Sequence, residues 1–168
     1  MKRIYCAFSL VEVLIVLAIL AWLATAYTPT AMASFSTDDE RMLLKQAQTQ
    51  LTFGLNRARQ LAVKAKQEVM LCGGQACDGN WSQGWEIRVN NQLISHHLFP
   101  AEIDVQWKGF PKSKKYILFL PSGHSGYQNG TFRLCASTLS AAVILNQSGR
   151  YYSAAITSLN DTSAGLWC

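Results

Sequence analysis

Apolar positions follow two helical patterns in the N-terminal third of the chain. Between Phe8 and Tyr27, 17 of 20 residues are apolar, which predicts a helix that is apolar on all sides. Farther on, apolar residues at helical spacing predict one face of an amphipathic helix: Leu44, Ala47, Leu51, Gly54, Leu55, Ala58, Leu61, Ala62 and Ala65. Before it, Thr37 to Glu40 combine an N-cap residue type with three acids, which is typical of a helix start. A single helix from Phe8 to about Lys66 would be roughly 90 Å long.

After Gln67 the apolar pattern changes to alternation, and turn-forming residues become frequent. The predicted strands are Glu68–Cys72, Gly84–Val89, Gln92–Leu98, Ile103–Trp107, Tyr116–Leu120, Thr131–Ala136, Ala142–Asn146 and Arg150–Ile156. A length of 168 residues suits one such domain. Short antiparallel strands packed on one long helix predict an α+β fold.

The N-terminal apolar segment has three interpretations. It begins after the basic residues Lys2 and Arg3, as a cleaved secretory signal does, and Ala31-Met32-Ala33 offers a small-x-small cleavage site. It can equally be an uncleaved anchor whose basic end stays in the cytoplasm. The third interpretation depends on Glu12, because a carboxylate inside a membrane helix costs about 2.5–3.5 kcal/mol. Neither of the first two interpretations explains that carboxylate.

The residues around Glu12 resemble the N-terminus of bacterial type IV pilins and pseudopilins. The matching features are a short basic leader, the small residue Ala7, then Phe8, Glu12 four residues later, and an apolar helix. The resemblance implies that a prepilin peptidase cuts between Ala7 and Phe8 and that Phe8 is N-methylated. Its new α-amine would pair with Glu12 of a neighbouring subunit during assembly. Ala7 departs from the glycine usual in the family, and Pro29 lies where pilins commonly carry a helix-kinking proline.

The same resemblance implies a type IV pilin fold, in which a long N-terminal helix packs on an antiparallel β-sheet head. Residues 1–7 would be the leader, and residues 8–35 a hydrophobic helix in the membrane or the filament core. Residues 36–168 would form a periplasmic head, with the second half of the helix at 36–67 and a β-rich part at 68–168. The expected partners are the inner membrane, a prepilin peptidase, and other minor and major pilins.

Four cysteines remain once the leader, with Cys6, is removed. An oxidising periplasm favours disulfides, and four cysteines allow three pairings. We pair Cys72 with Cys77, which closes a small loop, and Cys135 with Cys168, which ties down the last residue. The spacing alone does not fix that choice.

Catalytic and metal chemistry find little support in the sequence. His96, His97 and His124 could join the cysteines in a metal site, but no four-ligand spacing resembles a zinc site. Gly123-His124-Ser125-Gly126 resembles a nucleophile elbow, but Tyr127 replaces its last glycine. We therefore predict a turn there, no catalytic residues, no metal and no cofactor.

Beyond the N-terminus, much of the chain resembles the FimT/FimU/GspH group of minor pilins and pseudopilins. The matching stretches are Leu55 to Val63, Val69 to Cys72, Trp81, Gly84 to Ile87, Phe119 to Gly123, Gly130 to Cys135 and Val143 to Arg150. FimU-like members help to prime a type IV pilus and cap its tip. The other two roles that the resemblance implies are a tip subunit of a type II secretion pseudopilus, as for GspH, and DNA uptake, as for FimT.

DNA binding is a separate hypothesis with its own residues. FimT-like proteins carry a Gly-Arg-x-Arg motif near the C-terminus, and here Gly149-Arg150-Tyr151-Tyr152 lacks the second arginine. Lys112, Lys114 and Lys115 lie among aromatic residues, a pattern that single-stranded nucleic acid favours. From Ser36 onward, 13 basic and 9 acidic residues give a net charge of +4. The alternative is a solvated loop whose aromatic residues face the core.

Overall fold

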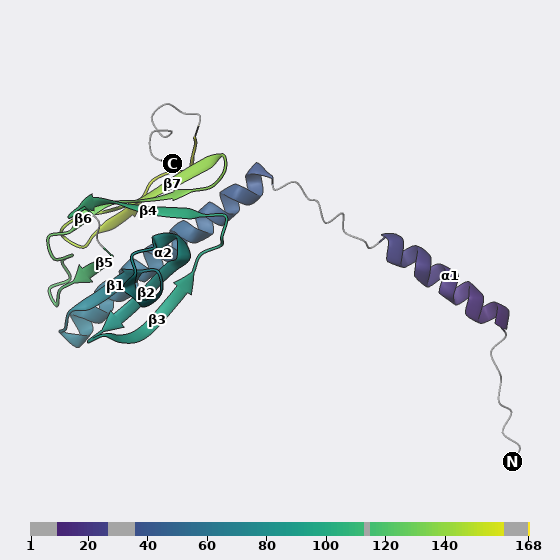
Figure 1. Ribbon diagram of the computed structural model, residues 1–168, viewed down its shortest axis with the longest axis horizontal. Coiled ribbons are helices and arrows are strands. Elements are labelled where there is room, and N and C mark those ends of the chain that lie inside the picture. Colours follow the sequence, from purple (N-terminus) through teal and green to yellow (C-terminus); the bar gives the residue numbers. More distant parts are fainter. Residues whose placement is uncertain (1–9, 27–35, 113–114, 160–167) are drawn as a thin grey trace, which may run out of the picture. The chain divides into compact units, whose positions relative to one another are not determined.

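The computed structural model describes residues 10–26, 36–112, 115–159 and 168 (Figure 1). The chain divides into two compact units, Met1–Ser34 and Phe35–Cys168. The first contains helix α1, Leu10–Ala26, which is apolar apart from Glu12 and Thr25. The predicted leader, Ala7, Phe8 and Pro29 lie outside the described residues.

The second unit, the head, begins with helix α2, Thr37–Ala65, which has its own N-cap. Ser36 has extended backbone angles, φ −77° and ψ 155°, and its hydroxyl accepts a hydrogen bond from the N–H of Asp39. The Asp39 carboxylate accepts in return from the hydroxyl and from the N–H of Ser36, which completes a capping box. The hydrogen bond from the Ser36 hydroxyl, and secondly that from its N–H, lower the pKa of Asp39. A single helix through this point is therefore wrong, and the N-cap is Ser36 rather than Thr37.

The strands of the head form two antiparallel sheets instead of one, and Figure 1 shows both beside α2. Sheet A has the order β3-β2-β1-β5, and sheet B the order β4-β6-β7-β8, with β9 also pairing with β7. Their bounds are β1 Val69–Gly73, β2 Gly84–Val89, β3 Gln92–Leu98, β4 Asp104–Phe110, β5 Tyr116–Phe119, β6 Asn129–Cys135, β7 Leu139–Leu145, β8 Tyr151–Ser153 and β9 Thr157–Ser158. Two short 3₁₀ turns, Gln75–Cys77 and Trp81–Gln83, separate β1 from β2.

The core lies between α2 and the inner faces of both sheets. The predicted apolar face of α2 is buried at Leu44, Ala47, Leu51, Gly54, Leu55, Ala58 and Ala62, whereas Leu61 is half-buried and Ala65 exposed. Gly54 is required for this packing, because a Cβ there would lie 2.8 Å from the Trp85 ring. Among the described residues, every buried apolar side chain lies between Leu44 and Leu145. The described part of the core therefore belongs entirely to the head.

The predicted last strand, Arg150–Ile156, is interrupted. The chain leaves the β7 ladder after Ser153, and the carbonyl of Ala154 accepts a hydrogen bond from the side chain of Gln48 at 2.8 Å. The same Gln48 amide also donates to the carbonyl of Ala142 at 3.0 Å. A buried side chain of α2 therefore holds β7 and the segment after β8 together.

A second polar contact fixes the first turn of α2 to the β6–β7 turn. The carboxylate of Glu40 accepts hydrogen bonds from the Ser137 hydroxyl and from both the N–H and the hydroxyl of Thr138. Glu40 is 5% exposed. The hydrogen bonds from Ser137 and Thr138 hold the pKa of Glu40 below its usual value of 4.5.

We expect replacement of Glu40 by glutamine to lower the melting temperature of the head at about pH 7, because an amide accepts these three hydrogen bonds less well than a carboxylate. The folded-state pKa is depressed, so the contribution of Glu40 is complete above its unfolded pKa and disappears as the pH falls through the folded value. Thermal melts of both forms between about pH 7 and pH 3 test this. The gap in melting temperature should close on acidification, and a gap independent of pH would contradict the assignment.

Candidate interaction sites on the helix and the head

Helix α1 presents an apolar surface around one carboxylate. Its large apolar side chains from Leu10 to Leu23 are between 42% and 77% exposed. Glu12 is also exposed and lies in the first turn, where the helix dipole favours a negative charge. Within the part of the chain that the structure describes, no helix is both long and apolar enough to cross a membrane. Glu12 is thus the one acidic side chain on a helix whose large apolar side chains are exposed.

The cysteines form disulfides in the predicted combination. Cys72, at the end of β1, is bonded to Cys77, which confirms that pairing, and their Cα atoms are 4.8 Å apart. Cys135, at the end of β6, is joined to Cys168 with a Cα separation of 5.9 Å. The first bond closes a loop at the end of β1, and the second ties the C-terminal residue to β6. A metal is bound by thiolates, and these four sulfurs are in disulfides.

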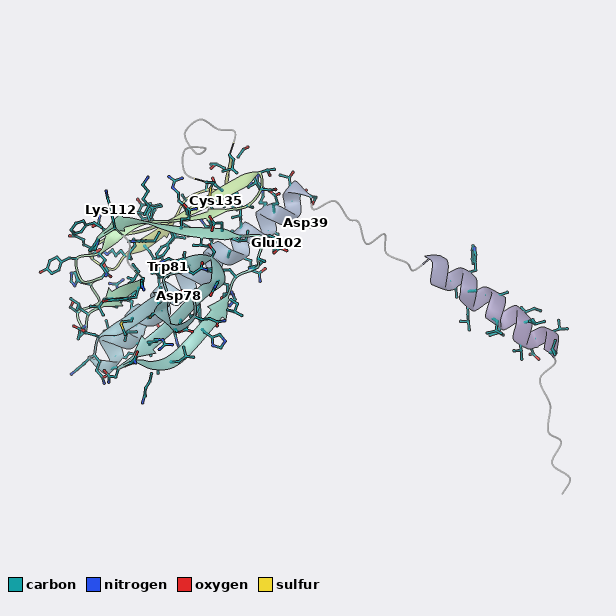
Figure 2. The ribbon with its side chains drawn as sticks, viewed as in Figure 1. Asp39, Asp78, Trp81, Glu102, Lys112 and Cys135 are labelled. Carbon is teal, nitrogen blue, oxygen red and sulfur yellow. A yellow bond between two sulfur atoms is a disulfide. The ribbon has the colours of Figure 1, made fainter. Side chains whose placement is uncertain are left out.

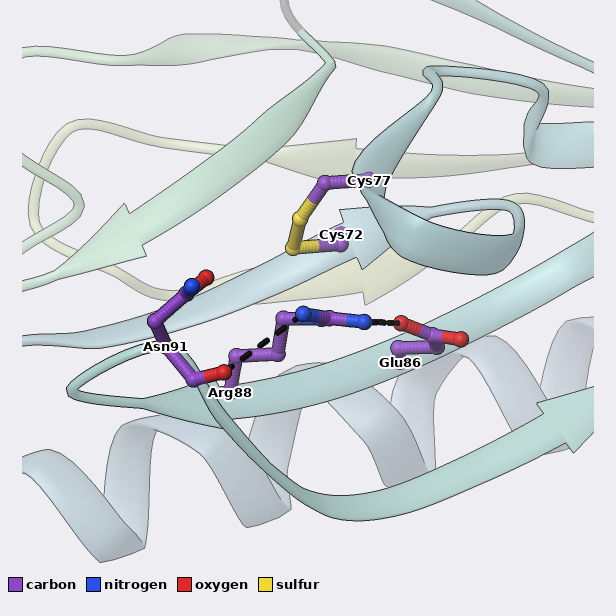
Figure 3. A network of polar contacts seen from close by, with 5 residues as sticks. All are labelled: Cys72, Cys77, Glu86, Arg88 and Asn91. Carbon is purple, nitrogen blue, oxygen red and sulfur yellow. Dashed lines mark hydrogen bonds and ion pairs between the residues drawn. A yellow bond between two sulfur atoms is a disulfide. The ribbon is translucent and has the colours of Figure 1, made fainter.

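Near the Cys72–Cys77 disulfide, an ion pair joins two residues of β2 on the outer face of sheet A (Figure 3). The Arg88 Nη2 and Nε atoms each lie 2.9 Å from the same Glu86 oxygen. Arg88 also donates to the carbonyl of Asn91 in the β2–β3 turn. Glu86 is 8% exposed, so this carboxylate is charge-paired where water has little access. The disulfide loop is itself joined to β2, because the N–H of Gly74 donates to the carbonyl of Gly84 at 3.0 Å.

The predicted turn at residues 123–126 is confirmed. The buried Ser125 hydroxyl lies within hydrogen-bonding distance of the carbonyls of Gln128, Asn146 and Gln147. His124 approaches Ser122 instead, at 3.1 Å, so no nucleophile–base pair forms with Ser125. The hydroxyl stabilises the contact between this loop and the β7–β8 turn.

Arg59 of α2 contributes to the same contact. Its Nε donates to the carbonyl of Gly123 at 3.0 Å. The carbonyl of Gly123 also lies so close to Gly149, whose φ is +72°, that a Cβ there would approach it to 2.2 Å. Arg59 is half-buried and therefore links α2 to the two turns rather than projecting into solvent.

Two of the histidines lie on β3, at the edge of sheet A, and β2 separates them from Cys72 on β1. His96 and His97 are neighbours on β3, opposite Glu86 and Trp85 of β2, and the His97 ring packs beside Trp85 and Phe99. Partial burial, and secondly the neighbouring His96, lower the pKa of His97. Among the described side chains, no group of three or more His, Cys, Asp or Glu residues is arranged to hold a metal.

The residues of the DNA hypothesis do not form one cluster. Lys112 is exposed just beyond the end of β4 (Figure 2), and Arg150 is exposed immediately before β8. Lys115 instead immediately precedes β5, and its side chain packs against Gly79. Lys114 lies outside the described residues. Lys112 and Arg150 therefore share one end of sheet B, whereas Lys115 belongs to another surface.

Sequence reasoning did not single out Arg133 of β6 or Tyr152 of β8. Lys108 and Phe110 of β4, Arg133 of β6 and Tyr152 of β8 project from the side of sheet B that faces away from the core. We call these four residues the basic–aromatic face. Their alternation within each strand was visible in the sequence, but their proximity depends on strand order and register.

Two known family profiles match the chain, one in each of its two units. The profile of the family described as Type II transport protein GspH matches residues 47–149, and that of the prokaryotic N-terminal methylation motif matches residues 2–27. No curated protein sequence matches the chain.

The head shares its fold with a solved minor pilin. The crystal structure of the type IV minor pilin FimU from Pseudomonas aeruginosa strain PAO1 aligns with a TM-score of 0.58 and 20% identity, over 69% of this chain and 91% of FimU. A second crystal form of FimU aligns with a TM-score of 0.57 and 19% identity, over 67% of this chain and 93% of FimU. At this identity the match establishes an α+β pilin fold.

Proposed function

Because this chain belongs to the GspH family of minor pilins and pseudopilins, we propose that it is a minor pilin that helps to prime a type IV pilus and remains in its tip complex. The methylation motif at residues 2–27 and the fold shared with the minor pilin FimU support this proposal. The family and fold are those of structural pilin proteins.

The N-terminal unit would pass through two environments. Before assembly, the apolar run from Phe8 to Tyr27 is long enough for the hydrocarbon core of the inner membrane, with the head in the periplasm. A prepilin peptidase would cut after Ala7 and methylate Phe8. The helix would then leave the lipid and pack among the helices of other pilins, which carries the head to the pilus tip at the cell surface.

Glu12 is the observation that carries the proposal. It is the one acidic residue of α1 and lies on a helix with large exposed apolar side chains. An unpaired carboxylate in such surroundings is unfavourable, and a positive partner removes most of that cost. Cleavage supplies such a partner, because it creates an α-amine on Phe8 at the membrane-embedded end of each subunit. Pairing between Glu12 and that amine would set the axial register of neighbouring subunits.

Recovery of the chain in sheared pili tests the assignment to a pilus. We expect it in the pilus fraction at a small fraction of the major pilin, and we expect fewer pili when its gene is deleted. Pili of normal number that lack the chain would contradict the proposal. If loss of the gene instead abolished secretion of folded exoproteins, the chain would be a pseudopilin of a type II secretion system.

A further inference from the structure

Tyr127 is an exposed aromatic residue with a backbone conformation that tyrosine rarely adopts. Its side chain is 81% exposed, and its φ of +62° follows a φ of +55° at Gly126. The N–H of Gln128 donates to the carbonyl of Ser125 at 2.9 Å, so Gly126 and Tyr127 are the central residues of a tight turn. Such positions favour glycine or asparagine, because a Cβ is unfavourable there. Neither burial nor turn chemistry explains a tyrosine at this position.

Buried hydrogen bonds fix this turn on both sides. Before it, the Ser125 hydroxyl lies within hydrogen-bonding distance of three backbone carbonyls of this loop and of the β7–β8 turn. After it, the side chain of Gln128, which is 1% exposed, accepts a hydrogen bond from the N–H of Leu118 at 2.7 Å. A strained backbone persists only where surrounding contacts hold it, and such residues cluster at ligand sites. The Tyr127 ring is therefore presented to solvent from a fixed position.

The ring borders a crevice of about 490 Å³, which we call the tyrosine crevice. Its described lining comes from the loop after β5 and from the β7–β8 turn, and consists of Leu120, Ser122, His124, Tyr127, Gln147 and Ser148. The N–H of Ser125 donates to the carbonyl of Gln147 at 3.1 Å, which joins the two walls. Sites for small molecules usually have volumes of about 300–1,000 Å³ and are largely formed before the ligand binds. The tyrosine crevice has both properties.

Uncharged hydrogen-bonding groups surround the ring. The hydroxyls of Ser122 and Ser148 and the amide of Gln147 can each donate and accept. The Gln147 amide nitrogen lies 3.5 Å from Asn129 Oδ1, at the long limit of a hydrogen bond, so a ligand can replace that contact. Among the described residues that line the crevice, none is Asp, Glu, Lys or Arg. An ionic ligand would find no permanently charged partner among them.

A pyranose sugar matches this combination of groups. One face of its ring carries C–H groups, whose partial positive charge is attracted to the negative face of an aromatic ring. Its edges carry hydroxyls, which need both donors and acceptors. A purely apolar ligand would instead separate the polar side chains of the crevice from water without replacing their hydrogen bonds, which is unfavourable.

The tyrosine crevice lies near the end of α2 that is farther from Ser36. Arg59 of α2 donates to the carbonyl of Gly123, between the lining residues Ser122 and His124. Arg59 is about 33 Å along the helix axis from Thr37. The crevice therefore belongs to the end of the head opposite to the one at which the chain enters from the N-terminal unit.

We propose that the tyrosine crevice binds a neutral saccharide. Tyr127 stacks on the C–H face of a pyranose ring, while Ser122, Gln147 and Ser148 form hydrogen bonds with its hydroxyls. This binding goes beyond the role in pilus assembly and does not depend on it, because every residue involved belongs to the head.

Saturation-transfer difference NMR on the full-length chain, in a detergent without a sugar headgroup, tests the proposal. The probes are the methyl glycosides of glucose, galactose, mannose and N-acetylglucosamine. We expect at least one of them to bind with a dissociation constant of about 1 mM. Saturation of the aromatic protons should reach the C–H protons of one sugar face more strongly than those of the other. Absence of transfer to all four glycosides at about 10 mM would overturn the proposal.

Two further kinds of probe identify the class of ligand. The methyl glycosides of glucuronic and galacturonic acid should bind no more tightly than the neutral glycosides, because the described lining offers their carboxylates no permanent cation. Tighter binding of either acid would contradict a neutral ligand. A triproline peptide with both ends capped offers apolar rings and carbonyls but no hydroxyls. Its binding in place of the sugars would identify a protein partner and overturn the proposal.

Tyr127→Gly separates binding from folding. Glycine adopts the left-handed region without strain, and a ring that is 81% exposed contributes little to the core, so the melting temperature should not fall. Sugar binding should weaken at least about threefold because the stacking surface is lost, whereas Tyr127→Phe should retain it. Unchanged binding in Tyr127→Gly would contradict the proposal. A melting temperature lowered by more than about 2 °C would show that the ring serves the fold instead.

Phe53→Ala is the matched control for the loss of an aromatic ring. Phe53 is 55% exposed on α2 and is not among the described residues that line the crevice. Its replacement should leave sugar binding unchanged. A loss as large as that in Tyr127→Gly would mean that the sugars contact exposed aromatic rings in general, and the assignment to this crevice would be wrong.

Discussion

Replacement of Glu12 by leucine is expected to lower incorporation of the chain into pili at least about tenfold, while the chain stays in the inner membrane at undiminished level. Leucine removes the cost of a carboxylate in lipid, so the membrane-inserted precursor becomes more stable. It also removes the group that would pair with the α-amine of Phe8 in the filament. The substitution therefore acts in opposite directions on the two environments. Quantitative blotting of membrane and sheared-pilus fractions measures both.

The control for this experiment is Val13→Leu, at the neighbouring position of α1. This exchange keeps the helix apolar and leaves Glu12 in place, so incorporation should be unchanged. Processing of the precursor at Ala7 is read from the same blots by the change in mobility. Incorporation of Glu12→Leu at the unmodified level would show that Glu12 does not direct assembly.

Gln48→Leu is expected to destabilise the head by about 1–3 kcal/mol. The side chain is 2% exposed, and its amide donates to the carbonyls of Ala142 and Ala154 at 3.0 and 2.8 Å. Leucine fills a similar volume but removes both hydrogen bonds; the carbonyl of Ala142 keeps the N–H of Ala154 as a donor at 2.9 Å, whereas the carbonyl of Ala154 loses its donor. Because those carbonyls belong to β7 and to the segment after β8, the loss should loosen the last strands of sheet B. Equilibrium unfolding in urea measures the change.

Gln46→Leu is the matched control, because Gln46 is exposed on the same helix two residues away. We expect it to change the free energy of unfolding by no more than about 0.5 kcal/mol. Equal unfolding free energies for the two variants would show that the amide of Gln48 contributes nothing through its hydrogen bonds.

Local patterns in the sequence predicted the elements of the head well. Helical spacing identified most of the buried face of α2, and alternation predicted β2 and β3 with the bounds that the structure has. The Cys72–Cys77 disulfide also agrees with the pairing chosen from the sequence, although the sequence alone left two other pairings open. The helix face and the strand bounds depend on residues that are close in the sequence, so a short-range pattern is enough to predict them.

Features that depend on distant residues were not predictable in the same way. Glu40 was expected only to favour the helix dipole, yet its partners, Ser137 and Thr138, lie 97 and 98 residues away. Gln48 interrupts an apolar face, and its role appears only once β7 and the segment after β8 are placed beside it. The division into two sheets and the proximity of Lys108 to Arg133 likewise require the order and register of strands, which alternation does not specify.

The mass of the N-terminal peptide of the chain recovered from sheared pili tests the central claim most directly. Assembly of the chain as a processed pilin predicts a peptide that begins at Phe8 and carries one methyl group on its α-amine. A chain that begins at Ser34 would be the product of ordinary secretory cleavage after Ala33. A chain that keeps Met1 would be an uncleaved anchor, and either result would contradict the account.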